Sequence, residues 1–129
     1  MGLVRVTAEI GTTYENLKPV SFLVDTGSFY TLLSPAVAQE LGIQATISAR
    51  VLMADGRPAS IPQGLAIMRL MDREGGVPVA IMDAPYALLG VTALEALGLK
   101  VNAAKQTLEE DWPWVAPPMF GVSQGAPRA

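Results

Sequence analysis

The sequence contains no histidine and no cysteine, and these two absences exclude most forms of nucleophilic catalysis. Without histidine the chain cannot form a Ser-His or Cys-His pair. Without cysteine it has no thiol nucleophile, disulfide or thiolate metal site, which fits a reducing compartment. Acid–base chemistry must therefore come from Asp, Glu, Lys or Tyr, and a metal site would need oxygen ligands.

Charged residues and long apolar runs are also scarce. Charged residues make up 16% of the 129 residues, hydrophobic residues make up 50%, and the formal net charge is -3. This composition predicts one globular domain with a substantial core, and the absence of a basic face argues against a nucleic-acid partner. No apolar run approaches the roughly 18 residues of a membrane span, and the first residues do not resemble a signal peptide. We therefore expect a cytoplasmic protein without a membrane partner.

The most informative motif is Asp25-Thr26-Gly27-Ser28, which directly follows the apolar residues 20–24. An apolar run of this length predicts a buried strand, which would carry a carboxylate into a turn at its own end. A carboxylate beside apolar chain is costly unless it is paired, hydrogen-bonded or protonated, and catalysis is one reason to keep it there. Asp and Gly are also common turn residues, so the tripeptide alone is a weak signal.

Strand patterns dominate the rest of the chain. We expect strands at residues 4–10, 30–33, 45–54, 57–61, 65–71, 77–82, 86–90, 99–101 and 106–108. Asp55-Gly56 predicts a hairpin turn, and Pro62 is expected to end the returning strand. The next hairpin turn is expected at residues 72–76.

Two short helices are expected between these strands. Ser34 predicts the N-cap of a helix that ends at Gly42. Thr92 and Glu95 stand at the spacing of a capping box, at the start of a helix that ends at Gly98. Apolar strand, turn, helix and Leu-Gly thus occur twice, which suggests two related halves, and only the first half contains Asp-Thr-Gly.

These features together resemble the retropepsin-like aspartic proteases, and more closely the bacterial branch than the viral one. The resemblance spans roughly residues 20–108 and rests on four segments. They are the apolar strand into Asp25-Thr26-Gly27-Ser28, the helix that ends at Gly42, the hairpin at Ala54-Asp55-Gly56, and Leu88-Leu89-Gly90 before the second helix. It implies a mostly β, closed barrel of the acid protease fold with two short helices and half of an active site in each chain.

The resemblance implies an aspartic endopeptidase with Asp25 as its catalytic residue. Two aspartates would face each other around one water molecule, one ionised and the other protonated. The sequence contains a single Asp-Thr-Gly, so the second aspartate would come from another copy of the chain in a homodimer. The substrate would be a peptide or protein, and the reaction would need no metal or organic cofactor.

The resemblance also assigns roles to the neighbours of Asp25. Thr26 would hydrogen-bond across the two-fold axis, and Gly27 would let the backbone donate to the carboxylate. The hydroxyl of Ser28 would reach the carboxylate and favour its ionised form.

Substrate binding would involve a hairpin that closes over an extended peptide as a flap, and two leucines before the second helix. The six residues are Met53, Ala54, Asp55, Gly56, Leu88 and Leu89. The polar tip of the hairpin favours a polar or charged substrate side chain. The leucines, read without the resemblance, are core residues.

Two other functions and one boundary stay open at this point. The same fold can serve as a dimerisation or peptide-binding module, since fold does not fix function. A metal protein would need converging carboxylates, but the acidic residues are scattered and residues 109–111 have the pattern of a solvated run. We expect a protease domain at residues 1–111 and a Trp- and Pro-rich extension or tail at residues 112–129, which would make an inactive form if it covered the cleft.

Overall fold

The computed structural model describes residues 4–111, and every structural statement below concerns this part of the chain. The Trp- and Pro-rich extension expected at residues 112–129, with Trp112 and Trp114, lies outside the described residues. The elements, in chain order, are β1 (Val4–Gly11), β2 (Lys18–Val24), β3 (Thr31–Leu33), α1 (Pro35–Leu41), β4 (Ile47–Leu52), β5 (Pro58–Leu70), β6 (Arg73–Ile81), β7 (Ala87–Leu89), α2 (Val91–Leu97), β8 (Leu99–Asn102) and β9 (Thr107–Glu110).

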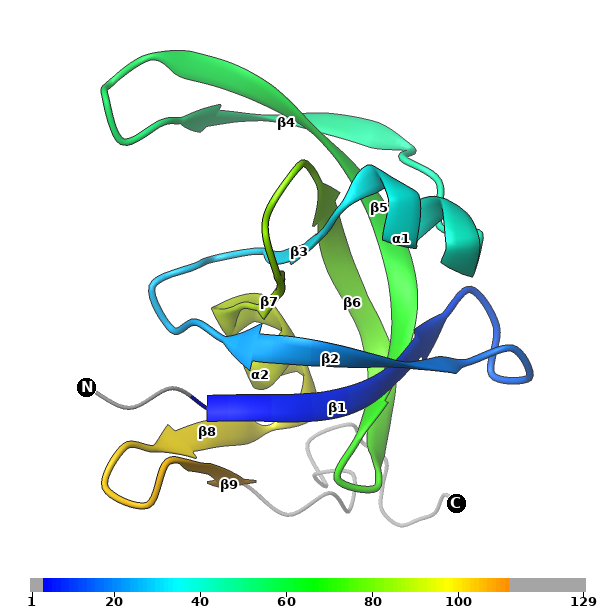
Figure 1. The fold of residues 1–129 in the computed structure, drawn as a ribbon, viewed down its shortest axis with the longest axis vertical. Helices are drawn as coiled ribbons and strands as arrows, with labels where there is room; N and C mark the ends of the chain where they lie inside the picture. The colour runs from blue at the N-terminus through cyan, green and yellow to red at the C-terminus, as the bar shows by residue number, and fades with distance from the viewer. Residues whose placement is uncertain (1–3, 112–129) are drawn as a thin grey trace, which may run out of the picture.

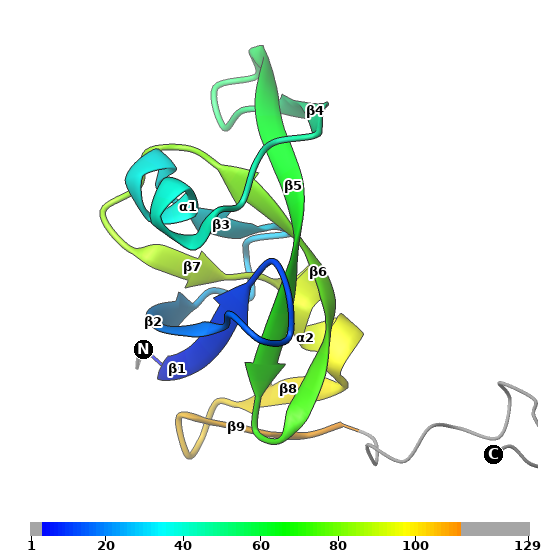
Figure 2. The ribbon, with the colours of Figure 1, turned by 90° about the vertical axis from the view of Figure 1, so that its right-hand side faces the viewer.

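Six of the strands close into a barrel. The larger sheet has the order β1-β2-β7-β3-β6-β5-β4, and an additional pairing of β1 with β5 closes the first six strands on themselves. The β2–β7 and β3–β6 pairs are parallel, so the barrel is mixed. The β4–β5 hairpin extends beyond the barrel as an arm, and β8 and β9 form a separate small sheet at the other end (Figures 1 and 2). The prediction of a mostly β, closed barrel with two short helices is confirmed.

The barrel wall has one face toward the core and one toward the outside. In β1 the buried side chains Val4, Ala8 and Ile10 alternate with exposed ones, as the sequence pattern predicts. The largest apolar side chains that are fully buried come from seven different elements; they are Ile10, Phe22, Leu33, Met68, Val77, Val79, Leu89 and Leu97. The prediction that β2 is a buried strand is wrong in one respect, because only Phe22 of β2 is fully buried. A strand in the wall of a barrel turns alternate side chains toward the core and the others toward the outside.

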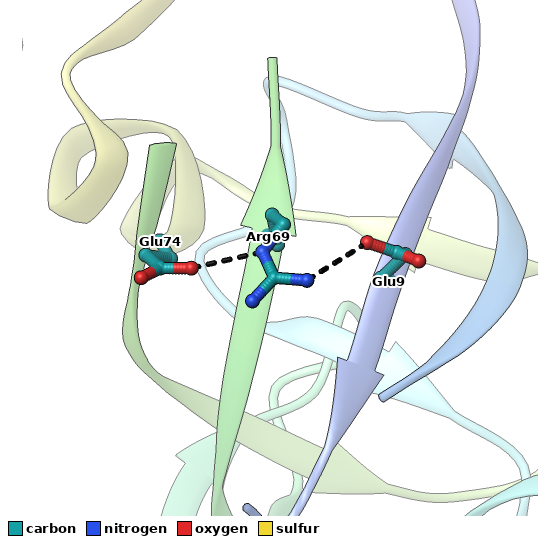
Figure 3. A network of polar contacts seen from close by, with 3 residues as sticks. All are labelled: Glu9, Arg69 and Glu74. Carbon is teal, nitrogen blue, oxygen red and sulfur yellow. Dashed lines mark hydrogen bonds and ion pairs between the residues drawn. The ribbon is translucent and has the colours of Figure 1, made fainter. Parts of the chain in front are cut away.

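A polar network crosses the seam where β1 meets β5 (Figure 3). Arg69 on β5 donates from Nε to Glu74 Oε2 on β6 at 2.8 Å and from Nη1 to Glu9 Oε1 on β1 at 3.3 Å. The hydrogen bond to Glu74 is the main reason that the pKa of Arg69 lies above its ordinary value. Because an arginine is already charged at physiological pH, this higher pKa adds no pH dependence there. The network ties three strands together at the seam.

The β5 strand is longer than the sequence predicts. Pro62 was expected to end it, but β5 continues to Leu70. The backbone of Gln63 faces β4, since its carbonyl accepts from the N–H of Thr46, so the nitrogen of Pro62 faces the other way. The β5–β6 register begins only at Gln63, and a proline nitrogen at position 62 therefore interrupts no hydrogen bond between these strands.

The hairpin turn predicted at residues 72–76 is also wrong. Met71 and Asp72 alone form the turn, both with positive φ, at 55° and 63°. Arg73 already belongs to β6, where its side chain is buried and Nη1 donates to the carbonyls of Leu97 and Gly98 at 2.8 and 2.9 Å. These buried hydrogen bonds at the end of α2 fix Arg73 in the strand and shorten the turn to two residues.

Candidate active site

The Asp-Thr-Gly motif begins the 25–30 loop, which connects β2 to β3. Val24 is paired with Leu89 in the parallel β2–β7 pair, and the N–H of Asp25 donates to the carbonyl of Leu89 at 3.0 Å. The backbone of Asp25 is therefore fixed by β7, one residue beyond the end of β2. Its side chain is half-buried.

A tight turn orients the carboxylate of Asp25. The N–H of Gly27 donates to Oδ1 at 2.9 Å, and the N–H of Ser28 donates to the carbonyl of Asp25 at 3.0 Å. A Cβ at position 27 would lie 3.2 Å from Oδ1, so a side chain there would crowd the carboxylate. The donor role expected for Gly27 is present in the structure. Because Gly27 donates to Oδ1, the other oxygen of Asp25, Oδ2, can contact a water molecule, a proton or a second carboxyl group.

The Ser28 hydroxyl does not act as expected. It donates to the carbonyl of Tyr30 at 2.7 Å, so its only hydrogen is already used and the predicted hydrogen bond to the carboxylate is wrong. The carbonyl of Tyr30 lies within reach because the loop turns back on itself between these residues. Ser28 therefore stabilises the shape of the 25–30 loop, and Thr26 is exposed beside it.

The N-terminus of α2 holds the same loop from the other side. The N–H of Val91 donates to the carbonyl of Ser28 at 2.8 Å. Thr92 donates to the carbonyl of Phe29 twice, from its N–H at 3.1 Å and from its hydroxyl at 2.8 Å. The capping box predicted for Thr92 and Glu95 is therefore wrong: Gly90 is the N-cap, and the loop carbonyls accept the first N–H groups of the helix.

Gly90 and Thr31 complete this support, and neither residue was predicted at the site from the sequence. The buried Thr31 hydroxyl oxygen accepts from the N–H of Gly90 at 3.1 Å. A Cβ on Gly90 would overlap the carbonyl oxygen of Tyr30 and lie 2.8 Å from that of Ser28. The signal in the sequence was the glycine that ends Leu88-Leu89-Gly90, because a glycine between a strand and a helix often marks a close approach of two backbones.

The two leucines expected at the substrate face opposite sides of the barrel wall. Leu89 is 0% exposed and belongs to the core, so its side chain offers no surface to a substrate and that assignment is wrong. Its contribution to the site is the carbonyl that accepts from Asp25. Leu88 faces outward and is half-exposed, beside Leu23 on β2 and Leu32 on β3.

The arm formed by β4 and β5 ends in the predicted hairpin turn. The N–H of Met53 donates to the carbonyl of Arg57 at 2.8 Å, and the N–H of Gly56 donates to the carbonyl of Met53 at 2.9 Å. Gly56 has a φ of 87°, which a residue with a side chain rarely adopts. Asp55 accepts from the N–H and Nε of Arg57 at 3.1 and 2.7 Å, and Ala54 completes the exposed tip. The tip thus carries its own ion pair.

The two faces of this arm differ in polarity. Residues directly opposite one another in the β4–β5 register share a face. One face is mostly apolar, with Ile47, Ala49, Val51, Ala59 and Ile61, and has Gln63 at its base opposite Ile47. The other carries Ser48, Arg50, Leu52, Pro58, Ser60 and Pro62. Arg50 therefore projects away from the apolar face.

Comparison with known proteins agrees with this geometry. A closed mixed barrel with an Asp-Thr-Gly loop and a projecting hairpin defines a retropepsin-like aspartic protease. Residues 6–101 match the family model described as aspartyl protease, and the chain therefore belongs to that family. No curated protein matches the sequence.

Two solved structures share the fold. EIAV protease complexed with the inhibitor HBY-793 aligns with a TM-score of 0.62 and 19% sequence identity, covering 78% of this chain and 93% of that one. A retropepsin-like aspartic protease from Rickettsia conorii aligns with a TM-score of 0.58 and 22% identity, covering 79% of this chain and 78% of that one. A viral and a bacterial protein thus show the same barrel at low identity.

Two further findings concern residues 4–111 only. No helix in this part of the chain is long and apolar enough to cross a membrane. No group of three or more acidic side chains lies close enough there to hold a metal ion together.

Proposed function

We propose that this protein is an aspartic endopeptidase that acts as a homodimer, with one Asp25 from each chain. The observation that carries the proposal is the geometry of the carboxylate. It lies half-buried at the end of β2, and the Gly27 N–H donates to only one of its two oxygens. The backbone around it is held by β7 and α2, so the carboxylate keeps its position without a bound substrate.

The requirement for two chains follows from the sequence and the chemistry together. Activation of water needs one carboxylate to accept a proton and a second carboxyl group to donate one. None of Asp55, Asp72 and Asp83 is followed by Thr-Gly or Ser-Gly, so none of them repeats the loop that orients Asp25. A two-fold axis beside the 25–30 loop would supply the second carboxyl group from a partner. The exposed Thr26 is placed in this proposal at the axis, where the two loops meet.

The proposed reaction is hydrolysis of a peptide bond by a water molecule between the two carboxyl groups. Two carboxyl groups in contact share one proton, because both cannot easily ionise. The ionised carboxylate takes a proton from the water as the water oxygen attacks the carbonyl carbon. The protonated partner donates to the carbonyl oxygen. When the C–N bond breaks, the proton taken from the water passes to the leaving amine, and one hydroxyl proton of the intermediate returns to the partner carboxylate, which restores the starting state.

The β4–β5 arm is proposed to cover the bound peptide. Its tip, formed by Met53, Ala54, Asp55 and Gly56, would exclude water from the reacting bond when the arm closes. Leu88, on the outer face next to the site, would contact the substrate. We place the protease domain in residues 1–111 and the protein in the cytoplasm, the latter supported by a sequence without cysteine.

Cleavage of a mixed peptide library from about pH 4 to pH 7 tests the proposal, with wild type compared against Asp25→Asn. The variant keeps the shape of the side chain but cannot accept the proton from water, so we expect a loss on the order of a thousandfold or more. Asp72→Asn is the matched control, because Asn is tolerated at a positive φ and this turn is remote in sequence from the site. It should cleave like wild type.

Sedimentation at several protein concentrations, in parallel, tests the dimer. Activity should rise with the dimer fraction. Equal cleavage by wild type and Asp25→Asn would overturn the protease proposal. A stable dimer in which neither protein cleaves any peptide would favour a peptide-binding or dimerisation module.

A further inference from the structure

A half-exposed apolar surface lies on the outer face of the barrel wall, directly beside Asp25. Leu23 precedes Asp25 by two residues in an extended chain, so the two side chains share one side of the sheet at a spacing of roughly 7 Å. The β2–β7 register places Leu88 next to Leu23, and the β1–β2 register places Arg5 on the other side of Leu23. Leu23 and Leu88 are both half-exposed.

Arg5 and Tyr86 stand at the edge of this surface. The Arg5 guanidinium carbon lies 5.5 Å from the centre of the Tyr86 ring, which fits a cation–π contact. Tyr86 precedes β7 and is 53% exposed, and Arg5 is exposed as well. The ring therefore holds the guanidinium beside the leucines while leaving it open to solvent.

The charge of Arg5 is not matched by a carboxylate within the described part of the chain. Three arginines in residues 4–111 each contact a carboxylate: Arg57, Arg69 and Arg73. Arg5 has no such ion pair among these residues. An exposed cation held over an aromatic ring, next to an apolar surface and a catalytic aspartate, is suited to an acidic ligand.

We propose that Arg5 selects glutamate as the substrate side chain next to the bond that is cut, on the surface that it shares with Leu23 and Leu88. The inference rests on the proposed function, since it takes Asp25 as the point of cleavage. The two methylene groups of a glutamate would lie on Leu23 and Leu88, and its carboxylate would meet the guanidinium. Aspartate is one methylene shorter and would reach Arg5 less well.

The size of the preference follows from the exposure of Arg5. An exposed ion pair is weak in water, and closure of the arm would strengthen it, so we expect glutamate to exceed glutamine about threefold to tenfold in kcat/KM. The preference requires an ionised substrate carboxylate, so it should disappear below about pH 4. Glutamine keeps the size and the methylene groups of glutamate and isolates the charge.

The experiment compares peptides that differ only in Glu, Gln or Lys, placed in turn at each position flanking the cut. The enzymes are wild type, Arg5→Gln and Arg5→Glu. Arg5→Gln should abolish the difference between Glu and Gln, and Arg5→Glu should reverse the preference toward Lys. Lys18→Glu is the matched control, because it makes the same change of charge at an exposed position at the start of β2, the opposite end of that strand from Asp25. It should keep the wild-type order of the three peptides.

The outcomes separate this inference from the proposed function. If wild type cleaves all three peptides equally, or if Arg5→Glu keeps the glutamate preference, Arg5 does not select the side chain and the protease proposal stands. A change of preference in Lys18→Glu as large as that in Arg5→Glu would show a general effect of net charge and overturn the inference. If nothing is cleaved, the proposed function fails first.

Discussion

The molecule contains two strand–turn–helix units that end alike and begin differently. In the first, β2 leads through the 25–30 loop and β3 into α1, and in the second, β7 leads directly into α2. Both helices end at a glycine in the left-handed conformation, Gly42 with a φ of 76° and Gly98 with a φ of 68°. Only the first unit has a loop between its first strand and its helix, and that loop carries Asp25.

The helix N-termini show what this difference does. The first helix is capped within its own unit, since Ser34 Oγ accepts from the N–H of Val37. The second has no side-chain cap, and its first N–H groups donate to the carbonyls of Ser28 and Phe29 in the 25–30 loop. The second unit therefore satisfies its helix terminus with the loop that carries the carboxylate. We call the first unit, which contains Asp25, the carrier, and the second unit, which holds the 25–30 loop in place, the support.

Replacing Gly90 by alanine should break this support and cause the largest effect. A Cβ at Gly90 would overlap the carbonyl oxygen of Tyr30, which belongs to the backbone and cannot rotate away. The loop or the helix must shift, and we expect a loss of about 3 kcal/mol or more in the free energy of unfolding. Urea denaturation measures this loss.

Gly75→Ala is the control for that change. A Cβ at Gly75 would lie 3.7 Å from the Leu97 side chain, which is ordinary contact, and Gly75 lies within β6. Alanine there should be neutral or slightly stabilising, within about 1 kcal/mol. Equal losses in the two variants would show that the close approach at Gly90 is not what holds the second unit to the loop.

Thr31→Val sharpens the comparison by removing a single hydrogen bond between the units. Valine keeps the buried volume but cannot accept from the N–H of Gly90, which would be left without its partner. We expect a loss of about 1–3 kcal/mol in the free energy of unfolding. We also expect a decrease in peptide cleavage, because the variant loses one of the hydrogen bonds that hold the 25–30 loop against the start of α2. Thr107→Val, at an exposed position in β9, should change neither. An unchanged denaturation midpoint in Thr31→Val would contradict the proposed link.

The sequence predicted the first unit more accurately than the second. Ser34 and Gly42 are local signals, because a cap and a left-handed stop act within one or two turns of their own helix, and both predictions are confirmed. Thr92 looked like the same kind of signal, but its hydroxyl donates to Phe29, which lies 63 residues away in the chain. A contact over that separation has no local pattern, so the capping box was wrong.

The same physical reason explains the other differences between prediction and structure. Arg73 was expected within the turn at residues 72–76, and its buried hydrogen bonds to the end of α2 hold it in a strand instead. Leu88 and Leu89 have the same side chain, and only the β2–β7 register decides which one faces the core. The motif around Asp25 was visible in the sequence, whereas Thr31 and Gly90 join the site through packing.

Ser34→Ala gives the smallest expected effect and shows how independent the first unit is. Ser34 Oγ accepts from the N–H of Val37 at 3.3 Å, and alanine removes this cap at a cost of about 1 kcal/mol in the free energy of unfolding. The hydrogen bond of the cap lies within the first turn of α1, so peptide cleavage by the folded protein should stay at the wild-type level while the denaturation midpoint falls. Ser48→Ala, at an exposed position of β4, controls for the loss of a hydroxyl group and should leave both quantities unchanged. If Ser34→Ala reduced cleavage as strongly as Thr31→Val, the two units would share one support, and the division into a carrier and a support would be wrong.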